Sequence, residues 1–203
     1  MTDATFWTKL APKYARNPIS DQAAYDYTLD RTRSYLGPKD KVLELGCGTG
    51  STALLLAPHV GHITATDYAP GMIEIVRAKP TEATNITFAV QQDVPDTGQY
   101  DAVLAFNLFH LVPDIDVQFR AIHALLPGGG YFISKTACLN SGWKWRLAGM
   151  VIPLMRLFGK APYVNRLSIQ GLERAITDAG FDIVESGTFP DPARYIVARK
   201  RAD

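Results

Sequence analysis

Apolar residues gather along this chain into short runs that alternate with longer segments in which they recur at helical spacing. The short runs, rich in β-branched and aromatic residues, cover residues 41–45, 62–66, 86–90, 100–106 and 131–134. The helical segments between them lie at 51–57, 68–79 and 116–126. Buried parallel strands have near-continuous apolar runs, and strands that alternate with helices indicate βαβ units. The pattern therefore predicts an α/β fold with a doubly wound, mostly parallel sheet.

The C-terminal part of the chain adds one helix and two strands to this pattern. The helix covers residues 168–179, with Ser168 as its N-cap and Gly180 as its stop signal. Strands are expected at 181–185 and 194–199. No repeat, linker or low-complexity segment interrupts the pattern, so the whole chain, 1–203, is predicted to form a single domain.

A helix is also expected before the first strand, at residues 20–36. Ser20 or Asp21 is its candidate N-cap, and Gly37 followed by proline is its stop signal. The side chains that we expect on its buried side are Tyr27, Leu29, Tyr35 and Leu36.

The N-terminal segment 6–17 is aromatic and basic. Phe6, Leu10 and Tyr14 share one face at helical spacing, which indicates that the segment docks onto the rest of the protein. Pro12 is expected to limit any helix here to short pieces. Together with the helix at 20–36, this segment forms a predicted N-terminal helical cap over residues 1–36.

Composition narrows the function classes. The chain has 203 residues, 47% of them hydrophobic and 20% charged, as in an ordinary soluble globular domain. The net charge of +1 gives no reason to expect a nucleic-acid partner. Cys47 and Cys138 stand apart from any metal-ligand spacing, so neither a metal site nor a disulfide framework is expected. The start of the chain lacks the features of a signal peptide and the longest apolar run, 147–155, is too short to span a bilayer, so we expect a cytoplasmic protein.

Three glycines follow the first predicted strand on alternate positions, at Gly46, Gly48 and Gly50. Glycine allows positive φ and lets a ligand approach the backbone, and the helix that follows offers free N–H groups at its start. A dinucleotide fingerprint has the order G-x-G-x-x-G, and its third glycine position is occupied here by Ser51. The turn therefore predicts a nucleotide-like ligand, although the glycines alone are weak evidence.

The stretch 44–50 resembles motif I of the class I S-adenosylmethionine-dependent methyltransferases, whose usual form is an acidic residue followed by x-G-x-G-x-G. Glu44, Gly46, Gly48 and Gly50 match this form, and Cys47 is interpreted as a small residue that fits the turn. The resemblance implies a Rossmann-like sheet whose last strand is antiparallel. It also implies that S-adenosylmethionine is the cofactor, S-adenosylhomocysteine the product, and in-line displacement the route of methyl transfer.

Asp67 ends the second predicted strand, 21 positions after Gly46. A carboxylate at this place can accept hydrogen bonds from both hydroxyls of a ribose. NAD enzymes use the same device, and the alternative is that Asp67 caps the helix that begins near Pro70. By resemblance, Tyr68 and Met72 are also assigned to the cofactor site.

The loop after the third predicted strand contains Asp93 and Val94. The resemblance places an acidic residue here that accepts a hydrogen bond from the adenine amino group, and it assigns the backbone N–H of Val94 to the adenine ring. A solvated loop aspartate is the alternative. Residues 127–130, Pro-Gly-Gly-Gly, match the family's turn into its fifth strand.

The fourth predicted strand ends at Phe106 and is followed by Asn107. In the resembled family this end faces the transferable methyl group. The Asn/Asp-Pro-Pro-Tyr/Phe motif of enzymes that methylate bases or amides is absent, and the segment looks more like that of small-molecule methyltransferases, including the quinone-biosynthesis type. His110 is a candidate general base for a weakly acidic hydroxyl, and the alternative is that it orders the loop. Tyr14 is a candidate cofactor or catalytic contact, and the alternative is that it only packs.

Residues 137–167 depart from the minimal fold. The stretch between Asp116 and Glu173 holds seven lysines and arginines and no acidic residue, and apolar residues recur at helical spacing from 147 to 158. We expect an inserted lid over the acceptor pocket, with Trp143, Asn107 and His110 contacting the acceptor. The alternatives are a core helix and contact of 143–160 with an anionic membrane surface.

Two other function classes remain open at this stage. One is an NAD(P)-dependent oxidoreductase on the same type of sheet, and the other is a non-catalytic protein that binds S-adenosylmethionine. The prediction is a methyltransferase, active as a monomer or homodimer, that acts on a small and hydrophobic or amphipathic acceptor. Oxygen, nitrogen, sulfur and carbon nucleophiles all remain open for the acceptor atom.

Overall fold

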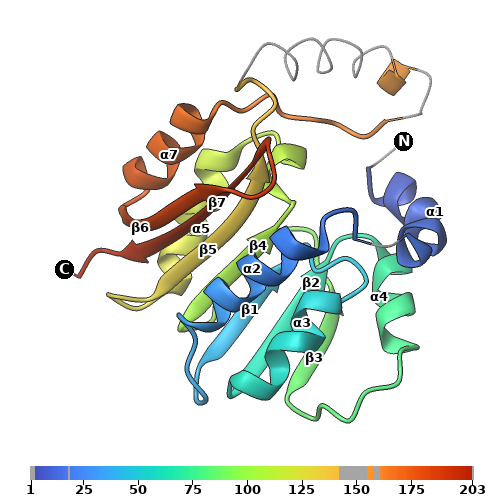
Figure 1. Ribbon diagram of the computed structural model, residues 1–203. Helices are drawn as coiled ribbons and strands as arrows, with labels where there is room; N and C mark the ends of the chain where they lie inside the picture. The colour runs from blue at the N-terminus through green and yellow to red at the C-terminus, as the bar shows by residue number, and fades with distance from the viewer. Residues whose placement is uncertain (1–2, 18, 142–154, 158–160, 203) are drawn as a thin grey trace.

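The computed structural model describes residues 3–17, 19–141, 155–157 and 161–202. Its strands form one sheet in the order β3-β2-β1-β4-β5-β7-β6 (Figure 1). The strands are β1 (Lys41–Leu45), β2 (His62–Asp67), β3 (Ile86–Val90), β4 (Ala102–Phe106), β5 (Tyr131–Ala137), β6 (Phe181–Thr188) and β7 (Ala193–Lys200). Neighbouring strands are parallel except that β7 runs antiparallel to both β5 and β6. The predicted Rossmann-like sheet with an antiparallel last strand is confirmed.

The helices lie between the strands as the apolar periodicity predicts. They are α1 (Asp3–Arg16), α2 (Gln22–Arg33), α3 (Ser51–Leu56), α4 (Pro70–Arg77), α5 (Ile115–Leu125) and α7 (Ile169–Asp178), with short 3₁₀ turns η1 (Ala57–His59) and η2 (Phe109–Leu111). Asp21 and Ser168 are N-caps whose side chains accept from Ala24 and Gly171. Ser168 was the predicted cap and Asp21 one of two candidates beside Ser20, because a side-chain oxygen there satisfies an N–H group that the first turn leaves unpaired.

Alternate residues of the strands point to opposite faces of the sheet, and each face has its own core. Leu43 and Val103 pack with residues of α5 and α7. Val42 and Ala102, one position earlier on the same two strands, pack with residues of α2, α3 and α4. Figure 1 shows α2 and α3 on the side of the sheet opposite α5. Strands β1 and β4 are therefore covered on both faces, which explains their near-continuous apolar runs.

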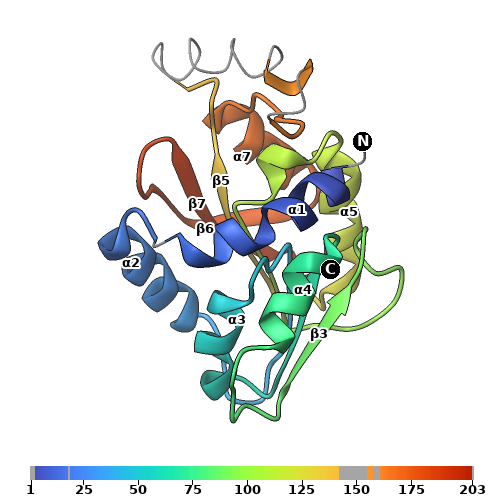
Figure 2. The ribbon, with the colours of Figure 1, turned by 90° about the vertical axis from the view of Figure 1, so that its right-hand side faces the viewer.

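The N-terminal segment forms one helix, so the expectation that Pro12 limits it to short pieces is wrong. Pro12 lies inside α1. The helix lies beside α4 (Figure 2), where fully buried Ala11 packs against Ala69 and Met72. This burial offsets the backbone hydrogen bond that a proline inside a helix removes. The predicted docking of the segment is confirmed, although its buried contacts centre on Trp7 and Ala11.

The buried side of α2 also differs from the prediction. The helix ends at Arg33, and its buried residues are Thr28, Leu29 and Thr32, whereas Tyr27 is 45% exposed. The hydroxyls of both threonines donate to backbone carbonyls of their own helix, Thr28 to Ala24 and Thr32 to Thr28. Hydroxyls that already donate a hydrogen bond can be buried at little cost. Packing against the sheet, rather than apolar character, therefore decides which side of α2 is buried.

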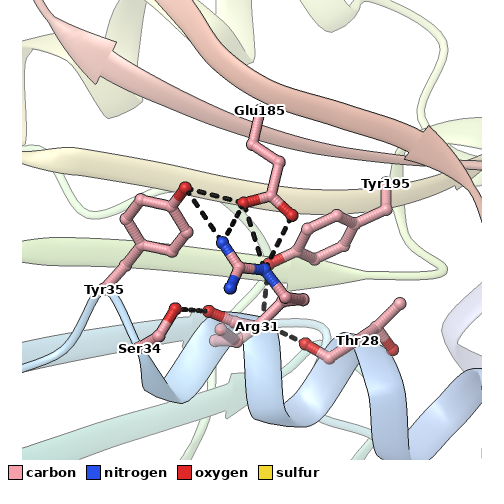
Figure 3. A network of polar contacts seen from close by, with 7 residues as sticks. Thr28, Arg31, Ser34, Tyr35, Glu185 and Tyr195 are labelled. Atoms are coloured by element: carbon pink, nitrogen blue, oxygen red, sulfur yellow. Dashed lines mark hydrogen bonds and ion pairs between the residues drawn. The ribbon is translucent and has the colours of Figure 1, made fainter.

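A polar cluster joins α2 to the far edge of the sheet. Figure 3 shows the Arg31 guanidinium and the Tyr35 hydroxyl converging on the Glu185 carboxylate of β6. Arg31 Nε lies 2.9 Å from Oε1 of Glu185, and the Tyr35 hydroxyl lies 2.7 Å from its Oε2. The hydrogen bond from Arg31 is the main cause that lowers the pKa of Glu185. The cluster fixes α2, which forms one wall of the cavity described below.

We expect Glu185→Gln to lower the melting temperature at pH 7 by a small amount, about 1–3 °C, because the pair is partly exposed. The pKa of Glu185 is lower in the folded protein than its ordinary value of 4.5. The stabilisation is therefore complete above pH 4.5 and lost as the pH falls through the lower folded pKa. Melting curves of both proteins from pH 7 to pH 3 measure this loss.

Asp30→Asn is the matched control, because Asp30 pairs with Arg33 at an exposed position three residues away. This control should change the melting temperature little at any pH. A pH-independent effect of Glu185→Gln, or an equal effect of Asp30→Asn, contradicts the assigned role of the cluster.

Most of the predicted lid, 137–167, falls on residues 142–154 and 158–160, which lie outside the described residues. Trp143 is one of these residues. The lid and its two alternatives therefore remain predictions. Among the helices that the structure does describe, none has the length and apolar character needed to cross a membrane.

Candidate active site

A cavity of about 490 Å³ opens at the carboxyl ends of β1, β4 and β5. Its walls come from the glycine turn after β1, from α2, from the end of α1 and from the loop that connects β6 to β7. Ligands of open α/β sheets bind at this edge. The predicted site residues that line the cavity are Tyr14, Glu44, Gly46, Cys47, Gly48, Phe106 and Asn107.

The three glycines of the turn all have positive φ, of 65°, 54° and 73°. Their surroundings differ. A Cβ on Gly50 would collide with Val76, and one on Gly46 would come within 2.9 Å of Leu108 Cδ1. A Cβ on Gly48 would meet only the Tyr14 ring, at 3.8 Å. Gly46 and Gly50 are therefore required by packing, whereas Gly48 leaves its backbone open to the cavity.

Neighbouring elements hold the turn in place. The backbone N–H of Gly48 donates to Asp67 Oδ2 at 2.9 Å, and the ammonium of Lys79 donates to the carbonyl of Thr49 at 2.6 Å. The backbone N–H of Cys47 donates to the carbonyl of Thr66 at 2.9 Å. Burial raises the pKa of the Cys47 thiol, so this cysteine stays protonated and unreactive. The interpretation of Cys47 as a small residue that fits the turn agrees with these contacts.

Asp67 lies at the end of β2 and is only 7% exposed. Its Oδ1 accepts from the N–H of Ala69 at 2.8 Å, and its Oδ2 accepts from Gly48. The N-cap of α4 is Ala69, without a side-chain cap, so the alternative that Asp67 is the capping residue is wrong. Each carboxylate oxygen has two lone pairs and can accept one more hydrogen bond. The ribose role of Asp67 stays a prediction that this geometry permits.

Glu44 is the most perturbed carboxyl of the site. It is 2% exposed, and its Oε2 has no hydrogen-bond partner among the described residues. Burial, and then the charge of Asp67, raise its pKa to about 8. The group is therefore mainly protonated at pH 7 in the protein alone, and a cation placed beside it would favour the ionised form. A buried carboxyl of this kind fits a ligand that carries an ammonium group.

Besides Asp67, four predicted cofactor residues do not line the cavity. Met72 and Tyr68 belong to the contact between α1 and α4, and Val94 is buried in the core beneath α5. Asp93 is exposed, and its carbonyl accepts from the Gln91 side chain. The ends of β2 and β3 are nevertheless adjacent, because the N–H of Gln91 donates to the carbonyl of Asp67 at 3.0 Å. These four assignments remain predictions.

Asn107 and His110 follow β4 in different settings. Asn107 has a φ of 56°, and its N–H donates to the carbonyl of Lys135 at 2.7 Å. Asparagine tolerates this left-handed conformation better than most residues, and strained positions of this kind cluster at functional sites. His110 is absent from the cavity lining, and burial lowers its pKa to about 4. The ring is therefore neutral at pH 7, and its role as a general base stays a prediction.

Three parts of the lining escaped the sequence analysis: Lys135 of β5, Tyr25 of α2, and the loop Pro190–Ala193. Lys135 is 8% exposed, and the Tyr25 hydroxyl lies 3.2 Å from the Thr52 hydroxyl. A lysine directly after the predicted strand at 131–134 was a signal that the sequence offered. Nothing local marks Tyr25 or the loop, because they reach the cavity through tertiary contacts.

This chain is similar in sequence to proteins of known family. Residues 19–186 match a family described as a methyltransferase domain. A ubiquinone biosynthesis O-methyltransferase from Xanthomonas axonopodis pv. citri is 31% identical over 193 residues, which cover 90% of this chain and 77% of that protein. A hybrid PKS-NRPS synthetase from Macrophomina phaseolina is 28% identical over 52% of this chain, which spans only 3% of the synthetase. The chain therefore spans only part of the length of relatives such as this synthetase.

A solved structure supports the same fold. Magnesium protoporphyrin IX methyltransferase from Synechocystis PCC 6803, with bound S-adenosylmethionine, superposes with a TM-score of 0.73 at 15% identity. The similarity covers 98% of both chains. At this identity the likeness concerns the fold alone.

Proposed function

This chain belongs to the methyltransferase domain family, and we propose that it transfers a methyl group from S-adenosylmethionine to a small, hydrophobic or amphipathic acceptor. The observation that supports the proposal is the cavity of about 490 Å³ at the carboxyl edge of the sheet. Small-molecule sites have volumes of roughly 300–1,000 Å³. The family assignment decides against the NAD(P)-dependent oxidoreductase that the glycine pattern left open.

The residues at one end of the cavity fit the methionine portion of S-adenosylmethionine. Gly48 offers an open backbone, and Glu44 has a buried carboxyl oxygen without a partner in the described part of the chain. We assign the cofactor's ammonium group to Glu44 and its ribose hydroxyls to the free lone pairs of Asp67. Asp93 and Val94 remain our proposal for the adenine, with Tyr68 and Met72 beside them. Tyr14, whose ring covers Gly48, would close this end of the cavity.

The cofactor supplies a methyl group that is already activated on a sulfonium, so the protein has to align two molecules rather than form a covalent bond. Phe106 and Asn107 lie at the end of β4, beside the glycine turn, and we propose that they border the reacting atoms. The apolar walls contributed by Leu29 and Pro192 exclude water from an apolar acceptor. His110 is retained as the proposed base for a hydroxyl acceptor.

A cavity-filling substitution tests where the acceptor binds. Ala193 lines the cavity on the side of β7 and is 9% exposed. We expect Ala193→Leu to lower kcat/KM for small acceptors by roughly tenfold or more, because the added carbon atoms occupy the acceptor's space. S-adenosylhomocysteine release in the presence of a panel of small phenols, acids and amines measures the reaction.

Ala23→Leu is the matched control, since Ala23 lies on the exposed side of α2 outside the cavity. Calorimetry should show unchanged S-adenosylmethionine binding in both variants. Binding of S-adenosylmethionine without product release from any small acceptor would favour the non-catalytic alternative. Equal losses of kcat/KM in the two variants would contradict the proposal that the acceptor binds in this cavity.

A further inference from the structure

Lys135 stands out among the residues that line the cavity. It lies near the carboxyl end of β5, directly beside Phe106 of β4 in the parallel register. The residue is 8% exposed, and what remains accessible faces the cavity that it lines. Its strand neighbours Ser134 and Thr136 are fully buried, so the backbone position of the lysine is firmly held.

The ammonium of Lys135 has no hydrogen bond and no ion pair within the described part of the chain. The ammonium lies 6.0 Å from the centroid of the Tyr25 ring. Burial is the main cause that lowers the pKa of Lys135, and the charge of Asp21 opposes it only in part. Asp21, Glu44 and Asp191 line the same cavity, and a buried lysine that forms no ion pair is unfavourable for the folded state. Such an arrangement is expected where a ligand supplies the missing anion.

The strand order separates Lys135 from the cofactor's end of the cavity. In the order β3-β2-β1-β4-β5, Lys135 lies two strands from the glycine turn, on the side opposite Asp67. A cofactor that rests on Gly48 and reaches Asp67 extends towards β2 and therefore away from β5. The space beside Lys135, bordered by Pro190 and Pro192, is left for the acceptor.

We propose that Lys135 is a specificity-determining residue that binds a carboxylate on an otherwise apolar acceptor. A charge-assisted hydrogen bond from the ammonium fixes one end of the acceptor, and the apolar walls hold the rest of it. The anion also offsets the positive charge that Lys135 and a sulfonium cofactor bring to the same cavity. This inference rests on the proposed function, because it assigns the β5 side of the cavity to the acceptor.

Equilibrium binding tests the inference without turnover. Calorimetric titrations with saturating S-adenosylhomocysteine compare 2-naphthoate with 2-naphthamide and benzoate with benzamide. In the native protein a carboxylate should bind roughly tenfold to a hundredfold more tightly than its amide. Lys135→Met should remove this preference and leave amide binding unchanged, whereas Lys135→Arg should restore part of it. Lys135→Met should also melt at the same temperature or higher without ligand, because it removes a buried charge.

Lys41→Met is the matched control, since Lys41 is exposed at the opposite end of β1 and its substitution changes the net charge equally. It should keep the carboxylate preference. A native protein in which no carboxylate binds more tightly than its amide overturns the proposal. The same holds if Lys135→Met weakens S-adenosylhomocysteine binding as much as carboxylate binding, because the lysine then serves the cofactor. A failure to release S-adenosylhomocysteine from any acceptor contradicts the proposed function and leaves this binding preference measurable.

Discussion

Gly50→Ala is expected to lower the free energy of unfolding by about 3 kcal/mol or more, which is a large fraction of the stability of an ordinary domain. Gly50 has a φ of 73°, where a residue with a Cβ is strained. Its added methyl would collide with Val76 of α4 and lie 3.0 Å from Phe88 Cε1 of β3. Val76 cannot move easily, because it is 1% exposed and belongs to the core under α2, α3 and α4.

Gly48→Ala should behave differently although it belongs to the same motif. Its φ of 54° imposes a similar backbone strain, about 1–2 kcal/mol, but its methyl would meet only Tyr14 at 3.8 Å. We expect this variant to fold and to bind S-adenosylhomocysteine roughly tenfold or more weakly, since the methyl occupies the open side of the turn.

Urea denaturation and calorimetry measure the two effects separately. Gly129→Ala is the matched control for backbone strain, because Gly129 has a φ of 85° in the turn before β5, at the other end of the sheet. It should be destabilised and still bind S-adenosylhomocysteine normally. Gly48→Ala with unchanged binding, or Gly50→Ala with native stability, would contradict the division of roles within the turn.

Glu44→Gln is expected to stabilise the protein alone while it weakens cofactor binding. The pKa of Glu44 is about 8 in the folded protein against an ordinary value of 4.5, so folding takes up a proton between these pH values. Stability is therefore lost as the pH rises from 4.5 to about 8, by about 1.4 kcal/mol per pH unit. At pH 7 the loss amounts to about 3 kcal/mol, and glutamine removes most of it.

The same substitution removes the carboxylate that we assign to the cofactor's ammonium group. S-adenosylhomocysteine binding should weaken by roughly a hundredfold at pH 8. In the native protein, affinity should rise with pH up to about 8, as Glu44 ionises. Unfolding free energies at pH 4 and pH 7, with calorimetry at pH 6 to 9, test both parts.

Glu82→Gln is the control for this pair of measurements, because Glu82 is exposed in the loop before β3. It should change neither stability nor binding. A stability gain for Glu44→Gln that is the same at pH 4 and pH 7 would contradict the buried, protonated state. If Glu44→Gln raises or lowers both the stability and the affinity for S-adenosylhomocysteine, the assignment of Glu44 to the cofactor's ammonium group is contradicted.

Local patterns in the sequence determined most of the fold. The apolar runs at β1 and β4 predict strands covered on both faces, because successive side chains of a strand point to opposite sides. Asp21 and Ser168 were recognisable as N-caps, since an N-cap needs only a side-chain oxygen and the backbone N–H two or three residues later. The glycine turn was recognisable for the same reason, because its conformational requirement lies within seven residues.

Other features were decided by contacts between segments far apart in the chain. Pro12 lies inside a helix because Ala11 packs against α4, more than fifty residues later. Only the tertiary structure shows that both carboxylate oxygens of Asp67 accept hydrogen bonds, whereas one carboxyl oxygen of Glu44 finds no partner among the residues that the structure describes.

The sequence by itself determined the sheet, the glycine turn and the family to which this protein belongs, because each depends on residues close together in the chain. Only the tertiary structure decided which ionisable groups are buried without a hydrogen-bond or ion-pair partner in the described ranges. Glu44 on β1 and Lys135 on β5 reach the same cavity across β4, and the charge of each depends on which atoms the fold places around it. Burial and partners of this kind arise from distant contacts, which no local pattern encodes.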